Sequence, residues 1–462
     1  MVSRLLYLEP GQLKRCWPFF VLYFFLFTAL TLADALSLTL FVQNVGTRLL
    51  PHCYAISSAF VLIGVTWYLR SASKYPSQWV FWLIMIVPLC LFMAVWVIVT
   101  LLGGHHLWYG LLFIGREIAF ALVVLHFGTY LQDYFTRAEL NRVMPLIYAG
   151  GRVGGILGGV LLEYTSPWIP PSGLLPVTAG LIGVGMVGVA WITRHRTHVE
   201  EPTDVSLVVE RKPKPPGNEG AVERGIKNPS ETDLGEAPTT WRGLMAFVWS
   251  NPLLFWISVT TILYFGCRAF LNFQYSVLFE EIFDNEAEMA RFLGRYTQWA
   301  LIGSLFLQLF VINRWIAFAG LKGAHMTYAA LLLMACLAGS VGLTLATAMF
   351  ARLIENELRY GLRNPVSQMI VNLFPKPQRI CARAWSLGFL IPVATLVSSV
   401  VLAVLVRWEL SVVIGVIVAL LGFGYLTASV GLIQSFREIS PPGFHTWRSR
   451  KRGEEPAKET GG

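Results

Sequence analysis

Charged residues are scarce in this chain of 462 residues. Asp, Glu, Lys and Arg make up 14% of the sequence, whereas hydrophobic residues make up 55%. A soluble domain carries about 25% charged residues, enough to keep its surface polar. The apolar residues form blocks close to the roughly 20 residues that a helix needs to cross a bilayer. The composition therefore argues against a soluble protein and predicts an all-α polytopic membrane protein.

The sequence also lacks catalytic and metal-binding motifs. Its six cysteines are scattered without a CxxC pair and are expected to fill apolar space. It contains no HExxH or Walker A motif, and no GxSxG in a strand-turn-helix context. We therefore expect no enzyme activity, no cofactor and no metal site. A cleavable signal peptide is not expected either, because the first apolar block is too long and has no small-residue cleavage site.

About twelve spans can be placed along the chain, six on each side of a polar segment. They are expected near 17–41, 49–69, 78–102, 107–132, 144–162, 174–193, 252–279, 292–312, 325–345, 347–374, 384–406 and 410–434. The segment between the sets is rich in Pro, Gly, Glu and Lys, which is typical of a flexible linker. The predicted parts are a six-helix bundle (1–193), a cytoplasmic linker (194–242), a second six-helix bundle (243–434) and a basic cytoplasmic tail (435–462).

The distribution of charge predicts the orientation in the membrane. The N-terminus, linker, tail and the loops on their side hold 26 Lys and Arg against 16 Asp and Glu, whereas the opposite loops hold 3 against 7. Lys and Arg are retained on the cytoplasmic side of membrane proteins. Both termini are therefore expected inside, with the acidic loop 280–288 outside. The net charge of +9 is attributed to this topology, and no nucleic-acid partner is expected.

Two sets of six spans joined by a linker are typical of major facilitator transporters, which expose a central site alternately to each side. Three parts of the sequence support a narrower resemblance. They are LFVQNVGTRLLPHCYAISSAF (40–60), the segment from Asn272 to Leu321, and the matched loops RVMPLIYAGGRVGGILGG and LFPKPQRICARAWSLG. Together they resemble the ATP/ADP translocases of plastids and intracellular bacteria, and more closely their bacterial relatives. The resemblance implies a multi-pass protein of a bacterial inner membrane.

The resemblance also implies an anionic substrate. Membrane-embedded lysines and glutamates are important in the exchangers of that family, and Glu117 in the fourth span is the matching acidic candidate. This sequence departs from the pattern because no lysine lies at membrane depth and arginine takes that place. The departure argues against adenine-nucleotide exchange itself, whereas an anionic substrate remains compatible with arginine.

Eleven charged residues fall at membrane depth, where they are costly and usually functional. They are Asp34, Arg116, Glu117, Arg152, Arg268, Arg295, Arg352, Glu355, Glu357, Arg359 and Arg363. We expect substrate binding by Arg268, Arg352, Asn356, Arg359, Arg363 and Arg116. Coupling or gating is assigned to Asp34, Glu117 and Glu355.

The tenth span provides the most regular pattern. Arg352, Asn356, Arg359 and Arg363 recur at i, i+4, i+7 and i+11, which places them on one face of an α-helix. The planar guanidinium suits bidentate capture of phosphate or carboxylate. The alternative is a set of internal ion pairs, with Glu355 on Arg359 or with Asp34 or Glu117 across the bundle.

The first and seventh spans carry opposite charges, Asp34 and Arg268. These helices line the cavity in major facilitator proteins, so the pair is interpreted as a gate, as a proton site at Asp34, or as a static salt bridge. Arg116 and Glu117 are adjacent and point about 100° apart, so they are expected to face different neighbours.

The fifth span contains interleaved GxxxG ladders around Arg152, which predict close helix packing. Arg152 and the loop residues Arg137 and Arg142 are expected to meet Asp133 and Glu139 as a cytoplasmic latch. Arg379 and Arg383 are expected to do the same in the second half.

The predicted function is secondary transport of a small anionic organic solute by alternating access, with nucleotides or other phosphorylated compounds favoured and antiport as the mode. The expected partners are that solute and membrane lipid, and the expected state is monomeric. One alternative is a proton-coupled exporter of amphipathic compounds. The other is a non-transporting membrane sensor or scaffold that acts through linker and tail.

Overall fold

The computed structural model describes residues 12–72, 74–196, 241–371, 374, 382 and 384–439, and no strand occurs among them. The N-terminal half contains α2 (Gln12–Val45), α3 (Leu50–Ala72), α4 (Ser77–Leu102), α5 (His106–Gln132), α6 (Arg137–Thr165) and α7 (Leu175–His195). The C-terminal half contains α8 (Trp241–Ser250), α9 (Pro252–Ile282), α10 (Glu286–Phe306), α11 (Asn313–Val341), α12 (Leu345–Arg352), α13 (Asn364–Val371), α15 (Ile391–Arg407) and α16 (Ser411–Ile439).

Short segments complete both halves. The 3-10 turns are η1 (Thr47–Leu49) and η2 (Pro171–Leu174), and the π-helical segments are η3 (Leu307–Ile312), η4 (Leu353–Arg363) and η5 (Ala384–Leu390). Most of the predicted linker and tail, 197–240 and 440–462, lies outside the described residues.

Ten helices in the described part of the chain are long and apolar enough to cross a membrane, and they match ten of the twelve predicted spans. The other two predictions fall near 292–312 and 347–374. The first corresponds to α10, which continues through η3 until the helix breaks at Gly320, where φ is 71°. The second corresponds to α12, η4 and α13, which carry five charged residues between Arg352 and Arg363.

Local sequence signals set several helix starts. Thr136 and Glu139 form a capping box at the start of α6, in which each side chain bonds the backbone N–H of the other residue. Asn285 caps α10 by accepting a hydrogen bond from the backbone of Glu288. These caps begin helices directly after the loops that turn the chain back into the bundle.

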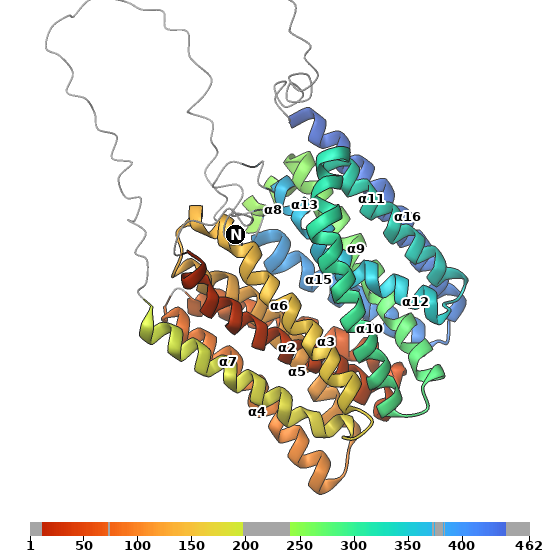
Figure 1. Ribbon diagram of the computed structural model, residues 1–462. Coiled ribbons are helices and arrows are strands. Elements are labelled where there is room, and N and C mark those ends of the chain that lie inside the picture. Colours follow the sequence, from red (N-terminus) through yellow and green to blue (C-terminus); the bar gives the residue numbers. More distant parts are fainter. Residues whose placement is uncertain are drawn as a thin grey trace, which may run out of the picture.

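The central helices of the two halves are α2 and α9. In the most apolar 18-residue stretch of each spanning helix, 61% of the stretch is buried in α2 and 67% in α9. The corresponding share is 28–44% in the other eight spanning helices. Figure 1 shows the two halves as separate groups of helices, with α6 and α10 side by side where they meet. The second inter-half contact joins α3 to α15. The fifth span thus packs on the eighth and the second on the eleventh, as expected for two pseudo-symmetric halves.

The glycine ladders of α6 confirm the prediction of close helix packing. The Gly150, Gly154 and Gly158 ladder faces α2, and a Cβ atom at Gly154 would lie 2.1 Å from the carbonyl oxygen of Phe24. In the second ladder, Gly155 and Gly159 approach α10, and a Cβ atom at Gly159 would lie 2.8 Å from the carbonyl oxygen of Gly294. The absence of side chains therefore lets α6 contact both halves at backbone distance.

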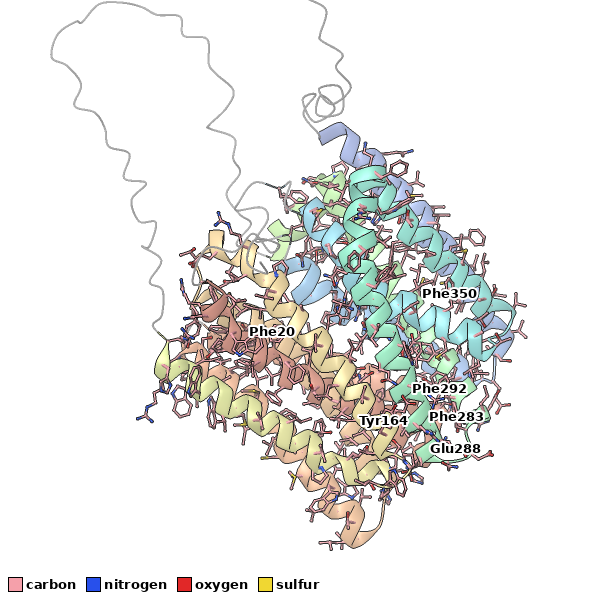
Figure 2. All side chains as sticks on the ribbon, in the orientation of Figure 1. Phe20, Tyr164, Phe283, Glu288, Phe292 and Phe350 are labelled. Atoms are coloured by element: carbon pink, nitrogen blue, oxygen red, sulfur yellow. The ribbon has the colours of Figure 1, made fainter. Side chains whose placement is uncertain are left out.

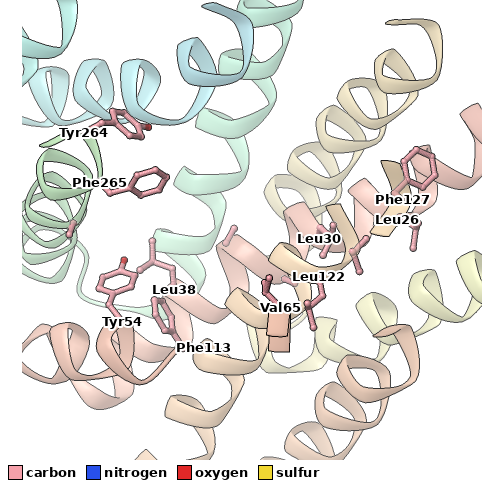
Figure 3. Close-up of a cluster of buried hydrophobic side chains, with 14 of the residues drawn as sticks. Leu26, Leu30, Leu38, Tyr54, Val65, Phe113, Leu122, Phe127, Tyr264 and Phe265 are labelled. Atoms are coloured by element: carbon pink, nitrogen blue, oxygen red, sulfur yellow. The ribbon is translucent and has the colours of Figure 1, made fainter. Parts of the chain in front are cut away.

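An apolar core surrounds the charged interior. Figure 3 shows part of it, with Leu26 and Leu30 of α2 near Leu122 of α5, and Tyr54 of α3 beside Phe113 of α5. The Tyr54 and Phe113 rings are 5.3 Å apart in an edge-to-face arrangement. This packing holds the charged helices α2 and α5 against each other and sets the positions of their polar side chains.

Candidate functional site

The two halves are tied together at the end predicted to face outward. The backbone N–H of Thr47 donates to Glu280 Oε2 at 3.0 Å, and the Thr47 hydroxyl also donates to this carboxylate. Asn44 donates to Glu286 Oε1 at 2.6 Å, and Gln43 donates to the carbonyl oxygen of Phe283 at 2.9 Å. We call these contacts the outer seal. They join the end of α2 and η1 to the turn between α9 and α10.

A second tie lies slightly deeper, between α6 and α10. Arg295 Nε donates to Glu163 Oε1 at 2.6 Å, and Gln298 donates to the other carboxylate oxygen. Figure 2 shows Tyr164, at the end of α6, at the same end of the molecule as Phe283, Glu288 and Phe292 around the start of α10. Glu163 was not singled out from the sequence because it ends an apolar span.

A charged network occupies the middle of the N-terminal half. Asp34 Oδ1 lies 2.7 Å from Arg116 Nη1, and Arg116 also pairs with Glu117 at 2.9 Å. Arg116 faces Asp34 and also pairs with the adjacent Glu117, because its long side chain can bend back to the neighbouring residue. Arg116 Nε donates to Ser37 Oγ at 3.0 Å, a partner that the sequence did not reveal.

Asp34 connects this network to the other half. Its second oxygen lies 3.5 Å from Arg352 Nη2 on α12, so one carboxylate is shared by an arginine from each half. The Asp34 side chain is 41% exposed even though α2 is a central helix, which shows that open space reaches it. The predicted pairing of Asp34 across the bundle is confirmed, with Arg352 as the partner.

Glu355 is the centre of the charged network in the C-terminal half. Its side chain is fully buried and accepts from Arg268 Nε at 2.6 Å, Asn272 at 3.1 Å and Tyr275 at 3.0 Å. Arg268, Asn272 and Tyr275 recur at i, i+4 and i+7 on α9. That spacing was the signal by which the sequence could have identified the two neutral donors.

Two sequence-based pairings are corrected by this geometry. Arg268 pairs with Glu355 rather than with Asp34, and Glu355 does not pair with Arg359. The second error has a backbone cause: η4 is π-helical, so hydrogen bonds run from i to i+5 and residues four apart no longer lie over one another. In the same segment Arg352, Arg359 and Arg363 are buried, while Asn356 is half-buried.

Arg152 occupies a different place from the one predicted. It lies on the inter-half face of α6, pairs with Glu357 of η4 at 3.0 Å and donates to Ser304 of α10 at 2.5 Å. It therefore does not reach Asp133 or Glu139. The glycines around Arg152 explain this, because they bring α6 close enough to the other half for its side chain to cross.

The cytoplasmic latch itself remains a prediction. Glu139 pairs with Arg15 at 2.9 Å, Asp133 ends α5, and Arg142 lies on α6. Partial burial alone would raise the pKa of Glu139, but the Thr136 backbone N–H and the Arg15 guanidinium hold it below the usual value. The Arg137 side chain and residues Arg379 and Arg383 lie outside the described residues.

Two guanidiniums of η4 have no carboxylate partner among the described residues. Five arginines at membrane depth pair with five carboxylates, namely Arg116, Arg152, Arg268, Arg295 and Arg352 with Asp34, Glu117, Glu163, Glu355 and Glu357. Arg359 and Arg363 remain, each 8% exposed. Among the eleven charges predicted at membrane depth, two positive charges on η4 therefore remain without a carboxylate partner within the described residues.

Each of these two arginines lies against an aromatic ring. Arg359 lies 4.4 Å from the centre of the Tyr360 ring and donates from Nη2 to the Tyr360 hydroxyl at 2.7 Å, while its Nε has no partner within the described residues. Arg363 lies 3.9 Å above the ring of Tyr264. Stacking on a ring occupies the face of a guanidinium and leaves its N–H edge available to an acceptor.

No group of three or more His, Cys, Asp or Glu side chains in the described residues is arranged to hold a metal ion. Arg359 and Arg363 instead offer N–H donors to an anion. The carboxylates named above are already paired with other arginines.

No known family model matches the sequence, and no curated protein matches it. Solved structures do match. The POT family transporter PepTSo is 10% identical over 92% of this chain and 98% of its own, with a TM-score of 0.60. The nucleoside transporter NupG is 10% identical over 89% and 98%, with a TM-score of 0.57. A bacterial homologue of the iron transporter ferroportin, in an inward-facing state, is 14% identical over 92% and 99%, with a TM-score of 0.54. The chain therefore has the polytopic all-α fold of the major facilitator transporters.

Proposed function

We propose that this protein is a secondary transporter of a small anionic organic solute. The observation that carries the proposal is the imbalance on η4, where Arg359 and Arg363 are buried without a carboxylate partner among the described residues. A buried charge is costly unless it is paired, so such a site favours an anionic occupant. The fold supplies two halves that can move against each other around this segment.

Arg359 is the first candidate donor to the solute. Its Nε is unpartnered and its Nη2 bonds only a tyrosine hydroxyl, so phosphate or carboxylate oxygens can bind the rest of its edge. Asn356, three residues before Arg359 and half-buried, is proposed as a neutral polar contact. Arg116, Arg268 and Arg352 are neutralised by carboxylates and contribute donors without adding net charge.

Asp34 is proposed to couple the motion of the halves to binding. It is shared by Arg116 of its own half and Arg352 of the other half, at 2.7 and 3.5 Å. The longer contact crosses the interface, so it breaks first when the halves move apart. Glu117 then remains as the second carboxylate for Arg116, and Glu355 retains Arg268.

Phosphorylated compounds, including nucleotides, are the favoured solutes, and antiport is the favoured mode. Two arguments support this choice: arginine binds phosphate in a bidentate manner, and three sequence stretches resemble the ATP/ADP translocases. NupG, one of the proteins with a similar structure, transports nucleosides. We also propose that the protein is a monomer in a bacterial inner membrane.

The test is counterflow in liposomes that contain the purified protein. Vesicles loaded with one unlabelled compound are offered a labelled panel of ATP, ADP, sugar phosphates, carboxylates and neutral controls. Uptake of one or more anions, with none of the neutral compounds, is expected. Failure of every anion to move overturns the substrate class.

Two variants of the assay address the alternatives. Efflux of lipophilic cations driven by a pH gradient, with no anion counterflow, would favour a proton-coupled exporter. Deletion of 200–240 is expected to leave anion transport largely intact. Loss of a bound partner after this deletion, in a protein that transports nothing, would favour a scaffold.

A further inference from the structure

A second group of polar side chains lies within the C-terminal half, behind Tyr264. It comprises Arg363 of η4, His325 of α11, and Tyr425 and Ser429 of α16. The His325 and Tyr425 rings are 6.3 Å apart, and the Tyr425 ring lies 6.3 Å from the Tyr264 ring on which Arg363 stacks. Ser429 follows Tyr425 by four residues and therefore lies on the same face of α16.

These side chains are buried far from water. Arg363 is 8% exposed, His325 is 3% exposed, and Tyr425 and Ser429 are completely buried. Nevertheless, both ring nitrogens of His325 and the Ser429 hydroxyl have no hydrogen-bond partner within the described part of the chain. Buried polar groups are nearly always satisfied by protein, water or a ligand, so this group requires an explanation.

The donors on these four side chains favour an anion over a cation as the bound ligand. Arg363 offers only N–H donors, the Tyr425 and Ser429 hydroxyls can donate, and a neutral histidine provides one N–H donor. No described carboxylate pairs with Arg363. A cation would meet an uncompensated guanidinium here, whereas an anion would meet several donors and one opposite charge.

The orientation of Arg363 adds a geometric argument. Its guanidinium carbon lies 3.9 Å from the centre of the Tyr264 ring, so the flat face of the group is covered by that ring. Tyr264 and Tyr328 use their own hydroxyls on the backbone carbonyls of Glu355 and Ile354, and so do not compete for an occupant. Arg363 can therefore offer an occupant its N–H edge rather than its covered face.

We propose that Arg363, His325, Tyr425 and Ser429 form a buried site for a small inorganic monoanion of the halide class. Arg363 lies against Tyr264 whereas Arg359 lies against Tyr360, so this site is separate from the organic solute proposed at Arg359. The bound ion neutralises Arg363 and links η4 to α11 and α16. The two positive charges left on η4 thus have different partners, a resident inorganic ion and a transported organic anion.

The experiment measures binding of radiolabelled chloride to the full chain in detergent by equilibrium dialysis, together with the midpoint of thermal unfolding. Chloride replaces gluconate at constant ionic strength. Saturable binding of one ion per chain and a chloride-dependent rise in the midpoint are expected. Absence of saturable chloride binding overturns the proposal and leaves water as the occupant.

Two variants locate the site. Ser429→Ala and His325→Phe each remove one donor and should weaken chloride binding by about tenfold, the effect of one hydrogen bond to a charged group. Ser435→Ala is the matched control on α16, because its hydroxyl already bonds the carbonyl oxygen of Gly431 at 3.1 Å. Equal chloride binding in the two variants and the control contradicts the assignment. Because the assay requires no transport, failure of anion counterflow does not affect its outcome.

Discussion

The two ends of η4 differ in how their charges are compensated. At the N-terminal end, Glu355 and Glu357 of η4 and the adjoining Arg352 of α12 each have an oppositely charged partner, on α9, α6 and α2 respectively. At the C-terminal end, Arg359 and Arg363 have only aromatic rings and hydroxyls among the described residues. One short stretch of helix therefore combines charges that have an oppositely charged partner with two charges that have none among the described residues.

This contrast separates structural from functional arginines. Removing one member of a buried ion pair leaves the other charge uncompensated, which is strongly destabilising. Removing an unpaired buried charge leaves no opposite charge without its partner. The fold should therefore tolerate the loss, whereas anion binding should fail. The predictions below test this difference, beginning with the largest expected effect on stability.

The paired end should be sensitive to substitution at Glu355. Glu355→Gln leaves Arg268, whose side chain is 26% exposed, without a carboxylate and is expected to lower the free energy of unfolding by about 1.5–3 kcal/mol, the scale of a hydrogen bond to a charged group. Denaturation in detergent micelles measures this. Glu281→Gln, at an exposed position in the outer loop, should change stability by less than about 0.5 kcal/mol. A similar small effect for both variants would show that the Glu355 network is not structural.

The outer seal should yield an intermediate effect. Combining Asn44→Ala with Thr47→Val removes two side-chain hydrogen bonds to Glu286 and Glu280 and should weaken closure by about 1–3 kcal/mol. Spin labels at Leu49 and Ile282, both exposed, report the separation of the halves at this end. A larger population with a long label distance is expected. An unchanged distribution would show that other contacts keep this end closed.

The partly exposed pair of Arg15 and Glu139, at the end predicted to face the cytoplasm, should contribute little. Glu139→Gln is expected to cost at most about 1 kcal/mol at neutral pH, as for other surface pairs. The pKa of Glu139 is lower in the folded protein, so its contribution is present above the usual glutamate pKa and disappears as pH falls through the folded value. Unfolding curves from pH 7 down to pH 3 should therefore converge for wild type and variant. A gap that persists at low pH would assign the effect to packing.

The smallest stability effect is expected at the unpaired end. Arg359→Gln removes a charge that no described carboxylate compensates, so unfolding should change by less than about 1 kcal/mol or become slightly harder. Arg268→Gln, which strands Glu355, is the matched comparison in the same denaturation assay. Equal destabilisation by both variants would remove the distinction between the two ends of η4.

Much of the fold follows from the sequence because membrane spans depend on local composition. Ten of the twelve predicted spans coincide with apolar helices, the first and seventh are central, and the glycine ladders of α6 mark close approaches to α2 and α10. Hydropathy and glycine spacing are read within one helix, so no tertiary information is needed.

The pairing of charges could not be predicted in the same way. The π-helical register of η4 displaces Glu355 from Arg359, and the contact of α6 with the other half takes Arg152 away from the latch. Glu163 was overlooked because nothing in its own span reveals Arg295 as a partner. These pairs depend on helices that are distant in sequence, whereas the burial of Arg352, Arg359 and Arg363 followed from their position within a span.

The central claim is that an uncompensated guanidinium at Arg359 binds the transported anion. Its most direct test is counterflow of a labelled organic anion into liposomes that contain Arg359→Gln, beside wild type and Arg359→Lys at equal protein content. We predict a loss of about 10- to 100-fold for Arg359→Gln and a partial loss for Arg359→Lys, with the variant still folded. Counterflow at the wild-type rate in Arg359→Gln would contradict the claim.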